Sequence, residues 1–297
     1  MSNGSQQSNG SADGQQQQQQ GARSDGRGQT VLLTGASSGI GLELARLFAR
    51  DGYRLVLVAE DEAGASQVTG ELEASASGGV TTIVQDLAED GAADTIADRL
   101  AAEGIEVDVL VNDAGIGIYG PFLETDIEEE TRLLHINIVA PTRLTKRLLP
   151  GMVARKRGRI LNLASVASFM PGPLMTVYYA SKAYDLSFSE GLAEELRGSG
   201  TGVTVTALCP PPTETNFDDR ARMGQIRAFR SRFASVADPS AVAEAGYAGM
   251  LQGKRIVTPN LTARLMTVSP RVMPRALLAR FSKVMQSQVR NPIERQD

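Results

Sequence analysis

The sequence is poor in the residues that build disulfides and metal sites. Its 297 residues include one cysteine, Cys209, one histidine, His135, and no tryptophan. A single thiol cannot form an intramolecular disulfide, and one cysteine with one histidine cannot complete a zinc site of the Cys/His type. The sequence therefore indicates a reducing compartment and no bound metal.

Long apolar runs and a surplus of positive charge are also absent. No stretch approaches the roughly 20 apolar residues that cross a bilayer, and the first residues lack the basic and apolar regions of a signal peptide. The formal net charge of −4 disfavours binding to nucleic acid, whose phosphates require many basic contacts. We expect a cytoplasmic protein that does not bind nucleic acid.

Residues 1–29 contain too few apolar side chains to fold. Only Met1, Ala12 and Ala22 are apolar, and Gln15–Gln20 form an uninterrupted glutamine run. Burial of so little apolar surface cannot offset the entropy that is lost on ordering. We interpret the segment as a disordered tail that the fold does not need; a glutamine run can alternatively nucleate aggregation or mediate contacts.

From Gln29 onward, short aliphatic runs alternate with longer segments of helical period, which is typical of βαβ units around a parallel sheet. The predicted strands are Thr30–Leu33, Arg54–Ala59, Val80–Gln85, Val107–Val111, Arg159–Leu163, Val203–Leu208 and Arg255–Thr258. The predicted helices are Ile40–Arg50, Glu62–Ala76, Glu89–Glu103, Ile127–Lys156, Thr176–Arg197 and Ser240–Gln252. This order predicts one doubly wound α/β domain of the Rossmann type over residues 30–260, with a mainly parallel seven-stranded sheet and helices on both faces.

Residues 261–297 form a basic extension. No acidic residue lies between Glu244 and Glu294, whereas that interval contains eight basic ones: Lys254, Arg255, Arg264, Arg271, Arg275, Arg280, Lys283 and Arg290. Interleaved leucines such as Leu261, Leu265 and Leu277 predict one or two basic amphipathic helices. Such helices either fold back onto the domain with a solvated basic face or make weak peripheral contact with an anionic membrane.

A glycine-rich turn follows the first predicted strand. Val31–Thr34 run directly into Gly35-Ala36-Ser37-Ser38-Gly39-Ile40-Gly41, and a segment with a helical apolar face comes next. Glycines let the backbone approach a pyrophosphate, while the helix N-terminus presents N–H groups to the phosphates. Because such turns also end many strands for conformational reasons alone, it is the place after the first strand that indicates a dinucleotide site.

A second motif, Tyr178-x-x-x-Lys182, stands far downstream of Thr34-Gly35-x-x-x-Gly39-x-Gly41. Together the two motifs resemble the short-chain dehydrogenase/reductase family in its compact, single-domain form, from Gln29 to about Pro259. Further motifs that resemble those of the family are Asp86-Leu87, Asn112-Asp113-Ala114-Gly115, Asn137, Ser165 and Pro210 to Thr215. The resemblance implies an NAD(P)-dependent oxidoreductase that interconverts a carbonyl compound and an alcohol by hydride transfer, assembled as a homodimer or homotetramer.

Four residues form the expected catalytic group. The spacing of Tyr178 and Lys182 places both side chains on one face of the predicted helix, and a nearby ammonium favours the ionised form of a phenol. The resemblance implies that Tyr178 is the general acid/base and that Lys182 also holds the nicotinamide ribose. It further implies that Ser165 binds the substrate carbonyl and that Asn137 anchors a water. Each residue alone has an ordinary structural explanation, whereas their joint spacing favours the catalytic one.

The resemblance also implies a set of cofactor contacts: Gly35, Ser37, Ser38, Gly39, Ile40, Gly41, Glu60, Asp86, Leu87, Asn112, Ala114, Gly115, Tyr178, Lys182, Pro210, Thr213 and Thr215. Glu60 follows the second predicted strand, where NADP-dependent members of the family often carry an arginine. A carboxylate there accepts hydrogen bonds from ribose hydroxyls and repels a 2′-phosphate, which favours NAD over NADP. Alternatively, Glu60 points into solvent and another residue sets the preference.

Three residues depart from the expected pattern. Asp113 stands where the family usually has an asparagine, and Pro211 stands where it usually has a glycine. Proline fixes φ at about −65° and removes an N–H group, so the loop there must be rebuilt if the glycine has a positive φ. Asp185, one turn after Lys182, interrupts an apolar stripe. These departures leave open an alternative function, a dinucleotide-binding sensor or scaffold with impaired turnover.

Two segments are predicted to border the substrate. They are Ala167–Val177 and Asn216–Ala237, the second of which we expect to be a mobile lid. Apolar side chains in the lid suit a hydrophobic ketone, aldehyde or oxoacyl group.

Overall fold

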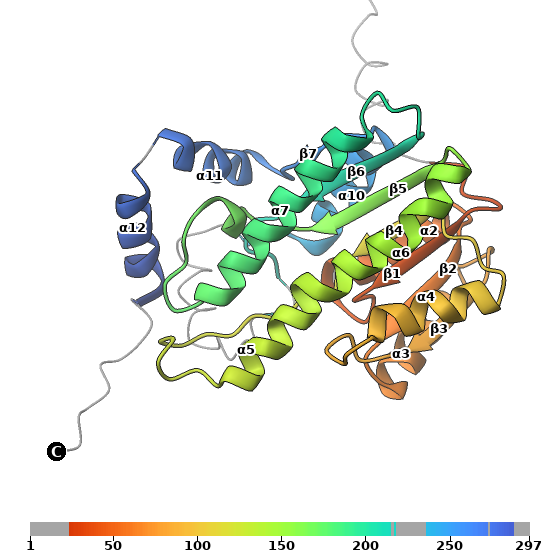
Figure 1. Cartoon of the computed structure of the whole chain (residues 1–297), viewed down its shortest axis with the longest axis horizontal. Helices are drawn as coiled ribbons and strands as arrows, with labels where there is room; N and C mark the ends of the chain where they lie inside the picture. Colours follow the sequence, from red (N-terminus) through yellow and green to blue (C-terminus); the bar gives the residue numbers. More distant parts are fainter. Residues whose placement is uncertain (1–23, 215–216, 218–235, 273, 288–297) are drawn as a thin grey trace, which may run out of the picture.

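A parallel sheet of seven strands forms the centre of the molecule (Figure 1). The computed structural model describes residues 24–214, 217, 236–272 and 274–287. The strands are β1 (Thr30–Thr34), β2 (Arg54–Ala59), β3 (Val80–Val84), β4 (Val109–Asn112), β5 (Gly158–Leu163), β6 (Val203–Leu208) and β7 (Ile256–Val257). They lie in the order β3-β2-β1-β4-β5-β6-β7 and all adjacent pairs are parallel. The predicted fold class is confirmed.

Helices cover both faces of the sheet. They are α2 (Gly39–Arg50), α3 (Glu62–Leu72), α4 (Ala92–Ala102), α5 (Ile127–Leu134), α6 (Ala140–Ala154), α7 (Thr176–Leu196) and α10 (Pro239–Leu251). Because side chains alternate along a strand, Val31 and Leu33 of β1 pack in one apolar cluster with α2, α3 and α10, whereas Leu32 packs in a second cluster with α4, α6 and α7. The sheet is therefore buried on both faces, as the continuous aliphatic runs predict.

The strand order places a crevice beside β1. From β1 the chain passes to β2 and β3 on one side, and then crosses to β4 on the other side of β1. In a doubly wound sheet, ligands bind at such a switch point, outside the carboxyl ends of the strands. The glycine turn after β1 and the Asn112 to Gly115 motif after β4 both lie at this point.

The long predicted helix Ile127–Lys156 is three segments in the structure. Between α5 and α6 lies a π-helix, η1 (His135–Val139), in which the N–H of Ala140 bonds to the carbonyl of His135. A π-helical turn bonds residue i to i+5 and is frequent at functional sites. The hydrophobic period of the sequence continues through this turn, so the sequence pattern alone predicts one uninterrupted helix.

Both ends of the predicted domain extend further than the sequence indicates. Ser24–Gln29, assigned to the tail, are joined to the domain: the N–H of Ser24 bonds to Asp51 Oδ2 at 2.6 Å and the N–H of Gly26 bonds to the carbonyl of Asp51 at 2.9 Å. Residues 1–23 lie outside the described residues. After β7 the chain forms two helices, α11 (Leu261–Val272) and α12 (Arg275–Ser287), and α11 packs against the short 3₁₀ helix η2 (Val166–Phe169).

None of the helices in the described part of the chain is long and apolar enough to cross a membrane.

Candidate active site

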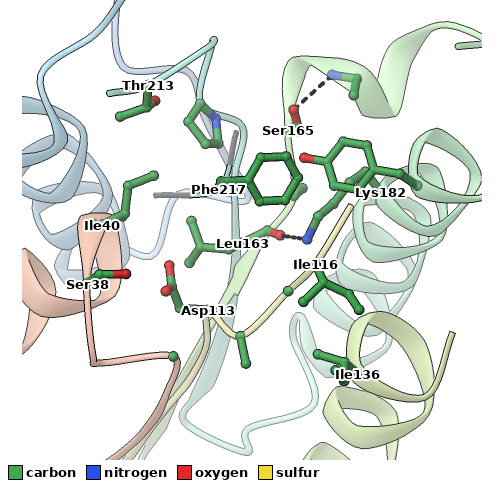
Figure 2. A pocket seen from close by; sticks show the side chains of 18 of the residues that line it. Ser38, Ile40, Asp113, Ile116, Ile136, Leu163, Ser165, Lys182, Thr213 and Phe217 are labelled. Atoms are coloured by element: carbon green, nitrogen blue, oxygen red, sulfur yellow. Dashed lines mark hydrogen bonds between the residues drawn. The ribbon is translucent and has the colours of Figure 1, made fainter. Parts of the chain in front are cut away.

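A pocket opens at the carboxyl ends of the central strands, and most of the residues predicted to bind cofactor or substrate line it (Figure 2). Those that do are Gly35, Ser37, Ser38, Gly39, Ile40, Glu60, Asp86, Leu87, Ala114, Gly115, Ser165, Tyr178, Lys182, Pro210 and Thr213. Gly41, Asn112 and Asn137 are not among the lining residues, and Thr215 lies outside the described part of the chain.

The glycine turn has the geometry that a phosphate group requires. Gly35 and Gly39 have φ values of +81° and +60°, a region that side chains disfavour. Gly41 is buried in α2, and a Cβ there would collide with the carbonyl oxygen of Gly35. The N-terminus of α2, at Gly39 and Ile40, lines the pocket, and the N–H groups of the first turn of a helix suit the pyrophosphate of a dinucleotide.

Lys182 lies in the wall of this pocket with its ammonium group buried. Nζ donates to the carbonyl of Leu163 at 2.6 Å and to Asp185 Oδ2 at 3.1 Å (Figure 2 shows the first contact). Burial by itself lowers the pKa of Lys182, but Asp185 and Tyr178 raise it, and the net direction is upward. The ammonium is thus held in its charged form close to Tyr178, which is half-buried and lines the same pocket.

Ser165 begins the short helix η2 directly after β5. Its Oγ accepts a hydrogen bond from the N–H of Ala167 at 3.1 Å, and Ser168 completes a capping box. Ser168 also donates to the carbonyl of Lys182 at 2.6 Å, which ties η2 to α7. Because the cap uses Ser165 Oγ as an acceptor, its hydroxyl proton can be donated to a substrate carbonyl in the pocket.

Asn137 lies in the π-helix and is 1% exposed. Its Oδ1 accepts from the N–H of Ile116, and its Nδ2 donates to the carbonyl of Ile116 and to Ser181 Oγ, all at 3.0 Å. The side chain therefore joins the segment after β4 to α7 and does not itself line the pocket. These bonds hold α7 at Ser181, the residue before Lys182, against the segment after β4.

Two acidic residues that line the pocket, Glu60 and Asp86, are bridged by one arginine. Arg132 of α5 donates to Glu60 Oε1 and to Asp86 Oδ2, each at 2.6 Å. Burial raises the pKa of Asp86, but the hydrogen bonds from Arg132 and from the N–H of Ala88 lower it more, so this carboxylate stays ionised. Glu60 does not simply point into solvent: although 67% exposed, its side chain is paired with Arg132.

Asn112 is part of the sheet rather than of the pocket surface. Its Nδ2 donates to Asn162 Oδ1 at 2.8 Å, and Asn162 in turn donates to Ser189 Oγ at 2.8 Å. This buried chain of hydrogen bonds links β4, β5 and α7. We infer that Asn112 stabilises the strands that carry the pocket rather than contacting a ligand itself.

Asp113 places a carboxylate against the glycine turn. A Cβ on Gly35 would lie 2.9 Å from Asp113 Oδ2, and one on Gly41 would collide with the same oxygen. Asp113 also contributes to the charge around Lys182. Asp113, a departure from the family pattern, therefore lies against the glycine turn and acts on Lys182.

Several lining residues were not identified from the sequence. These include Ile116, Ile136, Tyr179 and Met266, whereas Met170, Met175 and Phe217 fall in the segments predicted to border the substrate. The ring centroid of Phe217 lies 5.1 Å from that of Tyr178. Met266 belongs to α11, so the C-terminal extension contributes to the pocket; no local pattern in the sequence connects it with the site. Most of the predicted lid lies outside the described residues.

The fold and the pocket define a doubly wound α/β protein of the Rossmann type. The chain belongs to the short-chain dehydrogenase family, whose sequence profile matches residues 29–225.

Individual relatives agree with this assignment. The chain is 38% identical over 181 residues to a very-long-chain 3-oxoacyl-CoA reductase of Pyrenophora tritici-repentis, covering 60% of this chain and 53% of the relative. It is 31% identical over 278 residues to dehydrogenase/reductase SDR family member 7B of Rattus norvegicus, covering 88% and 84%. A short-chain dehydrogenase from Sphingobium yanoikuyae, solved in complex with NADPH, superposes with a TM-score of 0.72 at 30% identity, covering 91% of this chain and 99% of that one. The chain spans between 53% and 62% of the length of several curated relatives that it matches.

Proposed function

We propose that the protein is an NAD(P)-dependent oxidoreductase that interconverts a carbonyl compound and an alcohol, with Tyr178 as the general acid and base. One observation carries the proposal: the buried ammonium of Lys182, Tyr178 and Ser165 share a pocket with the phosphate-type glycine turn. The nicotinamide cofactor supplies or accepts the hydride when bound. The residues of this chain supply the proton and orient the reacting carbonyl group.

Each residue has a defined part in this proposal. Tyr178 donates the phenolic proton to the carbonyl oxygen during reduction and receives it back during oxidation. Ser165 donates a hydrogen bond to the same oxygen, where negative charge develops. Lys182 stabilises the phenolate through its charge and offers its remaining N–H donor to the ribose.

We further propose that NAD is preferred over NADP. The ends of β2 and β3 present Glu60 and Asp86, and Asp61 adds a third carboxylate, against the single charge of Arg132. A 2′-phosphate at this end of the pocket meets net negative charge. One relative was solved in complex with NADPH, so membership of the family does not by itself favour NAD, and the proposed preference rests on these local charges.

The substrate is proposed to be a hydrophobic ketone, aldehyde or oxoacyl compound. Met170, Met175, Phe217 and Met266 give the catalytic end of the pocket an apolar wall, and flexible methionines adapt to varied apolar shapes. The 3-oxoacyl-CoA reductase relative supports an oxoacyl group as one member of this class.

The direct test is turnover by the purified chain. Protein mixed with NADH or NADPH and a panel of ketones, aldehydes and oxoacyl thioesters should oxidise the reduced cofactor, followed by its absorbance. Tyr178→Phe should reduce kcat by about a thousandfold or more with little change in cofactor affinity, because only the proton donor is lost. Tyr184→Phe is the matched control: Tyr184 is on the same helix as Tyr178 but does not line the pocket, and its hydroxyl contacts Thr142 of α6 at 2.9 Å.

A second candidate is a dinucleotide-binding sensor or scaffold. Two departures from the family pattern, Asp113 and Pro211, favour it, because both line the pocket and change the surface against which a cofactor is oriented for hydride transfer. Cofactor binding without turnover across the panel would support the sensor. Asp113→Asn should then raise cofactor affinity severalfold without creating activity, whereas in an enzyme it should lower KM for the cofactor.

We also propose self-association and a basic surface contact. Ile127, Leu134 and Val139 are exposed apolar residues along α5 and η1, which suits a homodimer or homotetramer built on these helices. Leu261 and Leu265 of α11 and Leu277 of α12 are exposed in the interval between Glu244 and Glu294, which has no acidic residue, and this suits weak contact of a cytoplasmic protein with an anionic membrane. Light scattering and sedimentation with anionic vesicles at low salt test the two proposals separately.

A further inference from the structure

Asp185 forms a buried ion pair with Lys182 that the proposed reaction does not use. The two residues lie one turn apart on α7, with Nζ 3.1 Å from Oδ2, and their side chains are only 7% and 9% exposed. Leu186, the next residue after Asp185, belongs to a small buried apolar cluster with Ala164, Ala207 and Cys209. A carboxylate in such surroundings is costly unless it is paired, so its place beside the lysine calls for an explanation.

Two buried acceptors use most of the hydrogen-bonding capacity of the ammonium. Lys182 has three N–H donors, and the carbonyl of Leu163 and Asp185 Oδ2 accept two of them. One donor remains for the pocket. Leu163 is the last residue of β5 and Asp185 is on α7, so the two contacts together fix the position from which the ammonium acts on Tyr178.

We propose that Asp185 is a positioning residue for Lys182: its carboxylate anchors the ammonium and takes up part of the positive charge that otherwise acts on the Tyr178 phenolate. The proposal rests on the proposed function only for its consequence in catalysis; the ion pair and its effect on Tyr178 stand independently of turnover.

The charged and titratable groups around the pair come from three elements. Tyr178 and Asp185 act on Lys182 from α7, and Asp113 acts on it from the segment after β4. Cys209, at the end of β6, faces the pair as a neutral thiol, because burial, with a contribution from Glu190, raises the pKa of Cys209 to about 12. Burial raises the pKa of Asp185 above its ordinary value, because the opposing effect of the ammonium is smaller.

These charges fix the sign of the effect. An ammonium stabilises the phenolate, and a carboxylate 3.1 Å from the ammonium offsets that stabilisation. Asp185→Asn removes the offset and keeps the shape of the side chain. Lys182 retains the carbonyl of Leu163 as an acceptor and the charge of Asp113, both of which favour the ammonium form. The phenolate of Tyr178 should therefore form at a lower pH in the variant.

The experiment measures this phenolate directly. Because the sequence contains no tryptophan, ultraviolet difference titration reports tyrosine ionisation, and subtraction of the Tyr178→Phe spectrum isolates Tyr178. Asp185→Asn should move the phenolate band to lower pH by about half a unit or more, and should move the acid limb of the kcat/KM profile for alcohol oxidation in the same direction. Asp185→Glu, which keeps the charge, should restore the original profile.

Two comparisons separate positioning from a structural effect. Ser187→Ala, at an exposed residue of the same helix, should leave the titration unchanged. In a Lys182→Met background, Asp185→Asn should produce at most a small shift, because the two residues act as a coupled pair. An unchanged titration in Asp185→Asn, or a full shift that persists without Lys182, overturns the proposal. If Asp185→Asn does not fold, Asp185→Val supplies the same measurement with an apolar side chain. A shift in a protein that has no turnover overturns the proposed function alone.

Discussion

Arg132 Nη2 lies 2.6 Å from Glu60 Oε1, and this contact joins α5 to the carboxyl end of β2. The second guanidinium nitrogen, Nη1, is engaged by Asp86, so the arginine is neutralised by two carboxylates that line the pocket. A phosphate competes for this guanidinium only by displacing one of them. The cofactor preference therefore depends on α5 as well as on the residue after β2.

Glu60→Gln should raise affinity for NADPH relative to NADH by about tenfold, because it removes repulsion and frees the guanidinium for a charge-assisted pair with the 2′-phosphate. Adding Arg132→Gln should abolish most of that gain. Dissociation constants from the fluorescence of the bound reduced cofactors measure both effects without requiring turnover. A native protein that already binds NADPH tenfold more tightly than NADH contradicts this account of Glu60.

Met266 should control the size of substrate that the pocket accepts. Met266→Ala is expected to raise kcat/KM for a bulky ketone relative to a small one by about tenfold, because it opens space at the wall formed by α11. Leu265→Ala, at a neighbouring side chain that is 63% exposed, is the control and should change neither value. Equal effects of the two substitutions would show that α11 acts on stability rather than on the pocket.

Asp51 should make the fold sensitive to acid. Its side chain is 2% exposed and is bonded to Arg50 Nε at 2.7 Å, to the N–H of Ser24 at 2.6 Å and to the Tyr247 hydroxyl at 2.8 Å. Burial raises the pKa of Asp51, but these hydrogen bonds lower it further, to below its ordinary value. The ionised carboxylate therefore contributes stability above pH about 4, and this contribution is lost as the pH falls through the lower pKa of the folded state.

Asp51→Asn should accordingly lower the free energy of unfolding by about 1–3 kcal/mol at pH 7, and the difference from the native protein should narrow as the pH falls below about 4. Urea unfolding at several pH values measures it. Asp90→Asn, at a side chain that is 98% exposed, should show neither effect. A destabilisation that is constant with pH would mean that the charge of Asp51 is unimportant.

Gly191 offers a site for stabilisation. It lies in the middle of α7, is exposed, and has open space where a Cβ would be placed. Gly191→Ala should raise the free energy of unfolding by about 0.5–1 kcal/mol, because alanine loses less backbone entropy in a helix. Gly202→Ala is the opposite case and should destabilise, since Gly202 has φ +68° and a Cβ there would collide with the carbonyl of Lys156. Thermal melts of the two variants should therefore shift in opposite directions.

The sheet and the glycine turn could be predicted because their signals are local. Aliphatic runs such as Val203–Leu208 are buried on both faces, and the turn after β1 needs glycine at fixed positions. The position of Asp185 could not be predicted in this way. The sequence shows Asp185 only as a charge that interrupts an apolar stripe, whereas in the structure it is 6% exposed and bonded to Lys182. Likewise, the part taken by Met266 depends on how α11 packs against η2, a long-range contact that no short motif encodes.

The π-helical turn at His135–Val139 makes the length of the chain at this point as important as its composition. The bond from Ala140 to His135 encloses one residue more than an α-helical turn does. Side chains beyond the turn are thereby rotated by about 100° relative to the phase of α5. Arg132 before the turn reaches Glu60, Asn137 within it reaches Ile116, and Thr142 after it reaches Tyr184 at 2.9 Å. Loss of a single residue here would put these three contacts out of phase, whereas the exposed turn at Gly198–Gly200 can change length without moving any of them.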